Sequence, residues 1–273
     1  MENNQTAATP RWKFALKLAG AHLSVSLLVA ALMAWVVFKL WYPYPYDQMI
    51  GGLDLYWMVV GIDVICGPLL MAVLASPKKS RRAMWTDFTL IFTIQLTALL
   101  YGLHTVSLAR PVAVMFEKDR FVVVTAAQIA EQEADAPLSW SGAKRVYLPE
   151  PKTTEEKNRD IDLMMKGIEA SSLPSRWQAD NPAVRANITA VMQPVSLLNK
   201  TYPQQQEMIA KAVSQSGLPA EQLGFLPFTN DRNRDWVVLL NRNADKTTAE
   251  LSDISRAVEA LAEEAGERVT TLS

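Results

Sequence analysis

The sequence predicts a membrane protein in which three transmembrane α-helices precede a soluble α+β domain. Three segments, 18–41, 55–75 and 88–109, each exceed the roughly 18 apolar residues that a membrane-crossing helix needs. After them, short β-branched runs alternate with amphipathic stretches of helical spacing. We therefore divide the chain into a cytoplasmic N-terminal arm (1–17), a three-helix transmembrane region (18–109) and an exported α+β domain (110–273).

Basic residues in the flanking segments predict the orientation of the helices. Lys and Arg concentrate in the N-terminal arm and in the loop after the second segment, whereas loop 42–54 holds two aspartates and no basic residue. Because cytoplasmic loops are enriched in Lys and Arg, we expect the N-terminus inside and loop 42–54 and the exported domain outside. The first segment is too long for a signal peptide and lacks a small-residue cleavage site, which predicts a retained helix.

Loop 42–54 has features of a stiff turn at the outer membrane surface. Pro43 and Pro45 end the first helix, and Gly51 with Gly52 allows a tight return. Aromatic residues flank the loop, and we expect their rings in the headgroup layer. They are Trp41, Tyr42, Tyr44, Tyr46, Tyr56 and Trp57.

Composition excludes several classes of site. The net charge is −1, and the exported part has nineteen Lys and Arg, scattered among twenty-three Asp and Glu, so we predict no nucleic-acid surface. The single cysteine, Cys66, excludes an intramolecular disulfide and is expected as a small buried side chain. Both histidines lie in the apolar segments and no nucleotide-binding or hydrolase motif is present, so we predict no enzyme, metal or cofactor.

The exported part predicts two strand pairs and several helices. The runs 112–116 and 121–125 form a hairpin across EKDR, and 224–228 pairs with 235–240. A capping-box start predicts a helix over 153–172, whose acidic residues Glu155, Glu156, Asp160 and Asp162 are interpreted as a solvated face. Further helices are expected at 181–200 with an interruption near Pro194, at 203–217 with a Gly217 end, and at 247–265.

Asp63, in the stretch GIDVICGPLL, is the residue of the second span that most needs a partner. At 1.5 Å per residue, both Asp63 and Tyr101 lie about 12 Å from the outer ends of their helices, and His104 follows one turn after Tyr101. Depth therefore predicts a cluster of Asp63, Tyr101 and His104. Gln95 lies deeper, level with Ser24 and Ser26 of the first span, as a second interhelical contact.

Small residues and a proline surround Asp63. Gly61 and Gly67 allow another backbone to come close, and Pro68 leaves the carbonyl of Val64 without its helical donor. Three interpretations of the stretch remain open: a structural contact that sets helix register, a docking surface for a partner's membrane helix, and a proton-transfer site.

The segments LWYPYPYDQMIGGLDLY, GIDVICGPLL and SPKKSRRAMWTDFTLIFTIQLTALLYGLHTVSLARPVAVMFEKDRFVVV resemble the type IV pilin accessory proteins of the TfpX/TfpZ family over residues 36–125. The family pattern implies structural or docking roles, not catalytic ones, at positions in the outer loop, spans two and three and the domain entry. These positions are Tyr42, Pro43, Gly51, Gly52, Asp63, Gly67, Pro68, Gln95, Tyr101, Gly102, Arg110, Pro111, Phe116, Asp119, Arg120 and Phe121.

The resemblance implies a multi-pass protein of the bacterial inner membrane with a periplasmic domain. It implies a chaperone-like role in fimbrium biogenesis: binding and stabilising or modulating a cognate major type IV pilin, through its membrane helix and its head. Other pilus assembly proteins and the lipid bilayer are further expected partners. Two other functions remain open: a membrane-anchored periplasmic ligand sensor, and a proton-coupled membrane protein using Asp63 and His104.

Overall fold

The computed structural model describes residues 11–179, 181–230 and 236–242. The chain forms two compact units. The first comprises Met1–Lys39 and Leu53–Ser107, and the second comprises Leu40–Gly52 and Leu108–Ser273. The helix expected over 247–265 lies outside the described residues.

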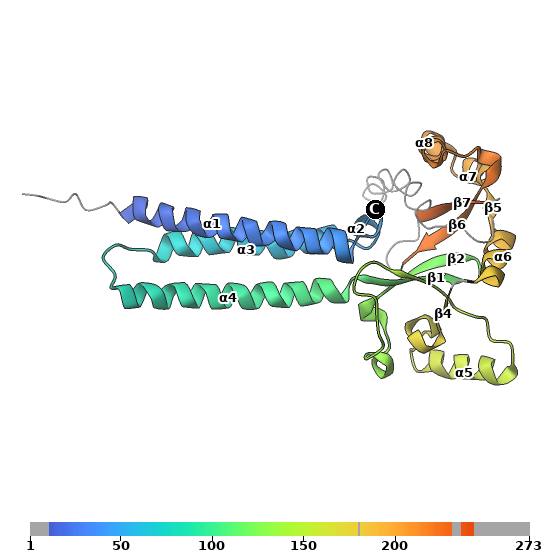
Figure 1. The fold of residues 1–273 in the computed structure, drawn as a ribbon, viewed down its shortest axis with the longest axis horizontal. Coiled ribbons are helices and arrows are strands. Elements are labelled where there is room, and N and C mark those ends of the chain that lie inside the picture. The colour runs from blue at the N-terminus through green and yellow to red at the C-terminus, as the bar shows by residue number, and fades with distance from the viewer. Residues whose placement is uncertain (1–10, 180, 231–235, 243–273) are drawn as a thin grey trace, which may run out of the picture. The chain divides into compact units, whose positions relative to one another are not determined.

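Three long helices make up the first unit, as the sequence predicts (Figure 1). Helix α1 (Arg11–Trp35) continues as a π-helix (Val36–Trp41), and α3 (Gly52–Leu74) and α4 (Arg81–Leu108) follow. All three are long and apolar enough to cross a membrane. The prediction of three membrane helices followed by an α+β domain is therefore confirmed.

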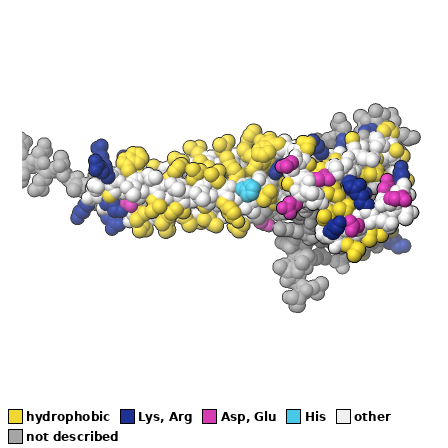
Figure 2. All heavy atoms as spheres, turned by 90° about the horizontal axis from the view of Figure 1, so that it is seen from below, with side chains coloured by type: hydrophobic (Ala, Val, Ile, Leu, Met, Phe, Trp, Pro, Cys, Tyr) yellow, Lys and Arg dark blue, Asp and Glu magenta, His cyan; other side chains and the backbone are white. Residues whose placement is uncertain are grey.

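The packing of the first unit suits lipid as its surroundings. Its buried core is small and centres on Ala19, Met71 and Ile91. Most large apolar side chains point outward, and hydrophobic side chains cover the helices along their length (Figure 2). Cys66, expected to be buried, is also exposed. Without water to drive burial, apolar side chains on a membrane bundle gain little by turning inward.

A mixed sheet forms the centre of the second unit. Its order is β4-β3-β1-β2-β6-β5, and β7 also pairs with β6. The β1–β3 and β2–β6 pairs are parallel, and the others are antiparallel. The strands are β1 (Pro111–Glu117), β2 (Arg120–Thr125), β3 (Lys144–Tyr147), β4 (Gln178–Ala179), β5 (Gln193–Pro194), β6 (Leu223–Thr229) and β7 (Trp236–Asn241).

Helices complete the second unit: α2 (Tyr46–Met49), α5 (Thr154–Met165), α6 (Pro182–Val191), α7 (Val195–Thr201) and α8 (Gln206–Ser216). Short 3-10 helices lie at Ala126–Gln128, Glu131–Glu133, Ala170–Ser172, Pro174–Arg176, Pro203–Gln205 and Ala220–Gln222. One apolar cluster joins α7 and α8 to β6 and β7, and another lies around β1 and β2. These clusters give the second unit its own core.

Both predicted strand pairs are present, and so are the interruption near Pro194 and the helix end at Gly217. The β1–β2 hairpin turns at Lys118 and Asp119, with φ +55° at Lys118. The 181–200 helix is interrupted at Pro194, which lies in β5, and α8 ends at Gly217 with a left-handed φ of 69°. Helix α5 ends at Met165, short of the predicted 172, and Gly167 follows with φ +74°.

The loop between the first two spans belongs to the second unit. Gly142 N donates to Leu40 O at 2.9 Å, and Asn230 Nδ2 donates to Met49 O at 2.8 Å. Trp41 and Tyr42, expected in the headgroup layer, are 3% and 0% exposed. Their expected placement is wrong because the aromatic bodies are buried against protein: Trp41 packs edge-on against Trp140, with ring centroids 5.5 Å apart.

Candidate functional site

Asp63 is held by Gln95 from the neighbouring helix, not by Tyr101 or His104. Gln95 Nε2 lies 3.2 Å from Asp63 Oδ1 and 3.2 Å from the Asp63 carbonyl oxygen. Tyr101 and His104 are both exposed on α4, and Tyr101 is 74% exposed. The prediction of an Asp63, Tyr101 and His104 cluster is therefore wrong.

The direction of side chains around the helix axis explains why Tyr101 and His104, although at a similar depth in the membrane, do not contact Asp63. At about 100° per residue, Tyr101 points about 240° and His104 about 180° around α4 from Gln95. The Gln95 face is turned toward α3, so the other two side chains are turned away from it. Depth along the axis determines height in the membrane but not the direction in which a side chain points.

His22 of α1 joins the same site, and the sequence reasoning missed it. A Cβ built on Gly67 would overlap both Gln95 Nε2 and His22 Cε1, so both side chains come close to the backbone of α3. His22 Nδ1 also lies 3.3 Å from Ser26 Oγ, and Ser24 Oγ donates to its own helix at Gly20 O. The contact expected between Gln95 and these serines is absent from the hydrogen bonds of the described residues.

We call His22, Asp63, Gly67 and Gln95 the Asp63 cluster, and all three spans contribute to it. Gly67 is required there because an added methyl group would displace the polar side chains. A second close approach joins α3 to α4, where a Cβ on Gly102 would lie 2.6 Å from Val59 Cγ1. Glycine therefore allows close helix packing at both positions.

Gly61 differs from Gly67, although the sequence grouped the two. A Cβ built on Gly61 meets nothing within 4 Å, so the bundle itself makes no use of its small size. Around it, Trp57, Ile65 and Leu69 are 60%, 66% and 60% exposed. These residues follow at intervals of four and share one face of α3. Pro68 lies inside the same helix.

The outer loop and the domain entry form a buried aromatic and ionic site in the second unit. Burial raises the pKa of the Tyr42 phenol, and the neighbouring Arg110 guanidinium opposes this shift. Burial lowers the pKa of Arg110 in turn, and its guanidinium lies 5.6 Å from the centroid of the Trp140 ring. Burial also raises the pKa of Tyr46 to about 12, against the opposing charge of Arg145.

The other family positions in this region have structural roles. Tyr46 N donates to Pro43 O at 3.0 Å, and Gly51 has φ +76°, a conformation that favours glycine. Gly52 begins α3 and Pro111 begins β1. The rings of Phe116 and Phe121 pack with centroids 5.4 Å apart across the hairpin, and Asp119 pairs with Arg120 at its exposed turn.

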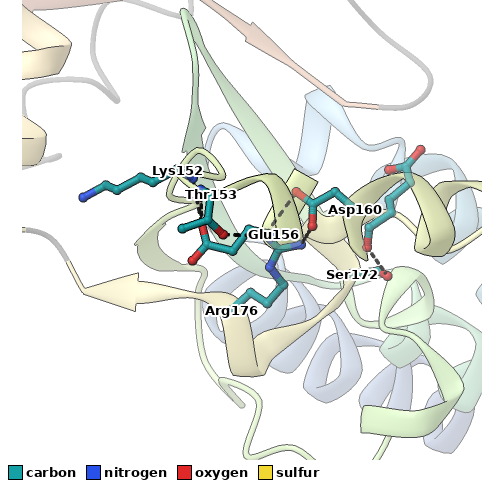
Figure 3. A network of polar contacts seen from close by, with 7 residues as sticks. Lys152, Thr153, Glu156, Asp160, Ser172 and Arg176 are labelled. Carbon is teal, nitrogen blue, oxygen red and sulfur yellow. Dashed lines mark hydrogen bonds and ion pairs between the residues drawn. The ribbon is translucent and has the colours of Figure 1, made fainter. Parts of the chain in front are cut away.

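A polar network surrounds the start of α5 (Figure 3). Glu156 N donates to Thr153 Oγ1 at 3.1 Å, and Glu156 Oε2 accepts from Lys152 N at 2.6 Å and from Thr153 N at 3.1 Å. These contacts confirm the predicted capping box. The same backbone donors lower the pKa of Glu156. Glu155, Glu156 and Asp162 are exposed, as the interpretation of a solvated face expects, whereas Asp160 is partly buried and forms an ion pair with Arg176.

Within the described residues, no group of three or more His, Cys, Asp or Glu side chains could hold a metal ion. The features of the described residues that could contact a partner include the exposed apolar face around Gly61 and the loop 40–52 of the second unit.

Comparisons with known proteins agree with one another. Residues 10–51 match the family described as fimbrial assembly protein FimB. The chain is 34% identical to the serogroup I fimbrial assembly protein of Dichelobacter nodosus, over 88% of this chain and 95% of that protein. The serogroup E1 protein of the same organism is 32% identical over the same shares. No solved structure matches the chain. The chain therefore belongs to the family of fimbrial assembly proteins.

Proposed function

We propose that the chain is an accessory protein of type IV pilus biogenesis, of the TfpX/TfpZ kind, which binds and stabilises its cognate major pilin in the bacterial inner membrane. The names of its relatives support a role in fimbrial biogenesis. The role is chaperone-like and non-enzymatic: the membrane helices contact the pilin's membrane helix, and the second unit contacts its head.

The observation that carries this proposal is the position of Gly61 in the middle of an exposed apolar face of α3, formed by Trp57, Ile65 and Leu69. A glycine inside a membrane helix costs helix stability, about 1 kcal/mol relative to alanine in a soluble helix. Gly67 and Gly102 offset that cost by close contacts inside the bundle, but Gly61 has no such contact. The face of α3 that carries Trp57, Gly61, Ile65 and Leu69 could bind an external helix. That helix would pack close to the backbone at Gly61, since small residues let two helix backbones approach.

The shared packing of loop 40–52 and the exported part supports the orientation. Both belong to one compact unit, joined by the contacts of Leu40 with Gly142 and of Met49 with Asn230. They must therefore lie on one side of the membrane. The basic residues of the N-terminal arm and of the α3–α4 loop support a cytoplasmic location for those segments, and hence a location of the second unit outside the cytoplasm, where a pilin head is also exposed.

Capture of the pilin from membranes tests the proposal. The tagged full chain is purified in mild detergent from cells that make its neighbouring major pilin, and the recovered pilin is compared with an unrelated pilin. Gly61→Leu should reduce recovery roughly tenfold, because the larger side chain fills the space that a partner helix needs to pack close to the backbone at this position.

Gly20→Leu is the matched control, since a Cβ on Gly20 of α1 also meets nothing within 4 Å. It should leave recovery unchanged. Equal recovery of both pilins by the wild-type chain, together with normal piliation after deletion of the gene, would contradict the proposed function. Equal losses for Gly61→Leu and Gly20→Leu would contradict the docking face.

A further inference from the structure

The second unit contains a cleft that is separate from the Asp63 cluster and from loop 40–52. Its volume is about 890 Å³, within the roughly 300–1,000 Å³ range of small-ligand sites. The turn residue Lys118, the start of α5, the edge strand β4 and helix α6 all line it. Tyr147 and Trp177 supply aromatic surface, and Trp177 Nε1 is fixed by donating to the Ser171 carbonyl at 3.0 Å.

The charges that line the cleft leave an excess of cations. Arg176 is neutralised by Asp160, as Figure 3 shows. Lys118, Lys152 and Arg159 are exposed and form none of the ion pairs among the described residues.

The carboxylates of the cleft do not balance these three cations. Glu156 accepts from the backbone amides of Lys152 and Thr153 at the start of α5, and its charge also interacts with the side chains of Lys152 and Arg176. Asp160 pairs with Arg176, and Glu150 forms none of the ion pairs among the described residues. Four cationic side chains thus face three acidic ones in the lining, an excess of one positive charge, so the cleft favours an acidic ligand over a basic one.

The edge of the sheet at β4 offers backbone hydrogen bonds to a ligand, in addition to the charges of the cleft. In the described part of the chain, β4 pairs with β3 only, and both of its residues are exposed. Gln178 of β4 and Asn187 of α6 line the cleft, and the side chain of Asn181, also in the lining, caps α6 and donates to Ala179 O. An exposed strand edge offers backbone donors and acceptors to an added strand, and the amides of Gln178 and Asn187 extend that pattern.

We propose that this cleft binds an extended, acidic polypeptide segment. The segment lies along β4, its carboxylates contact Lys118, Lys152 and Arg159, and its apolar side chains pack on Tyr147 and Trp177. The further statement that the segment belongs to the fimbrial subunit rests on the proposed function. The proposal that the cleft binds an acidic segment is independent of that function.

Peptide binding to the purified full chain in detergent tests the cleft directly. The probe is a fluorescein-labelled ten-residue peptide of alternating Glu and Val, and the comparison is the same peptide with Gln in place of Glu. Fluorescence anisotropy should show tighter binding of the Glu peptide at low salt, with the preference lost at high salt. Equal affinity for both peptides would overturn the proposal.

Reversing the charges of two cleft residues tests whether the peptide binds in the cleft. The double variant Lys152→Glu/Arg159→Glu should bind the Glu peptide roughly tenfold more weakly, because two partly exposed ionic contacts become repulsive. The matched control is Lys200→Glu/Lys211→Glu, which reverses two exposed cations on α7 and α8 outside the cleft. A loss of equal size in the control would mean non-specific attraction and would overturn the assignment.

Pilin capture by the same variants separates this proposal from the proposed function. If wild-type chain captures no pilin but binds the Glu peptide through Lys152 and Arg159, the proposed function fails and the cleft stands. If Lys152→Glu/Arg159→Glu loses the peptide but captures pilin normally, the segment does not belong to the fimbrial subunit. If pilin capture and peptide binding fall together, both proposals are supported.

Discussion

At the residue scale, the bond from Gln95 to Asp63 explains how a carboxylate is accommodated inside a membrane helix. The amide donates to both the side chain and the backbone carbonyl of Asp63. An amide donor of this kind satisfies an aspartate, a protonated aspartic acid or an asparagine equally well. The contact therefore favours a role in helix register over one that needs a proton to leave.

Substitution of the two partners should separate these roles. Asp63→Asn keeps an oxygen that accepts from Gln95, so thermal stability in detergent and piliation in cells should both be retained. Gln95→Leu leaves the Asp63 side chain without that donor and should destabilise the bundle by about 1–3 kcal/mol. The measurement is thermal unfolding of the purified full chain.

The double variant Asp63→Leu/Gln95→Leu is the control for this pair. It removes both polar groups and should recover part of the stability that Gln95→Leu loses, since replacing both partners by apolar groups is nearly neutral. A folded Asp63→Asn protein that fails to support piliation would instead indicate that the carboxylate takes part in proton transfer.

At the element scale, loop 40–52 acts as a structural part of the second unit. Its helix α2 places Tyr46 against Phe228 of β6, with ring centroids 6.5 Å apart, and its Met49 carbonyl accepts from the buried Asn230. The loop thus contributes buried surface to a sheet whose strands begin some sixty residues later in the chain.

Truncation of Tyr42 measures how much the loop contributes. Tyr42 is fully buried in the second unit, and Tyr42→Ala should cost about 3–5 kcal/mol, as for other large buried aromatic residues. Tyr101→Ala is the matched control because that side chain is 74% exposed on α4, and it should change stability by less than about 0.5 kcal/mol. Chemical unfolding of the full chain, followed by Trp fluorescence, compares the two.

A small effect of Tyr42→Ala, similar to that of Tyr101→Ala, would contradict the packing of the loop into the second unit. Loss of stability in both variants would indicate instead that the exposed face of α4 is covered in the detergent-solubilised protein.

Elements with a strong local pattern were predictable from the sequence, and elements that depend on tertiary pairing were not. The three spans, the β1–β2 hairpin and the capping box each carry a signal within about twenty residues. Strands β4 and β5 have two residues each and no period of their own. The rotation that brings Gln95 and His22 to Asp63 is likewise set by packing between helices, which hydropathy does not describe.

At the scale of the whole molecule, the fact that two separate chain segments form the second unit constrains the topology in the membrane. Loop 40–52 is separated from Leu108–Ser273 by two candidate spans, yet both belong to the second unit. An even number of crossings between them is therefore required. This requirement is independent of the distribution of Lys and Arg, and it is compatible with the orientation proposed from that distribution.

Single cysteines in a Cys66→Ser background should report this orientation. In cells with a permeabilised outer membrane, an impermeant maleimide should label Gln48→Cys in the loop and Lys200→Cys in the second unit. It should not label Lys78→Cys in the α3–α4 loop until the inner membrane is broken. Labelling of Lys78→Cys alone would reverse the proposed orientation, and different labelling of the first two positions would contradict the shared unit.

The hydrogen bond between Asn230 and Met49 has a consequence for the order of synthesis. The two residues are 181 positions apart, and at ~5–20 residues per second the ribosome needs roughly 10–40 s to make the intervening chain. During that interval the loop has left the ribosome with its aromatic side chains unburied and with its two flanking spans entering the membrane. The newly made protein therefore passes through a stage in which the aromatic side chains of the loop remain accessible, because the strand segment that contacts them in the folded chain has not yet been made.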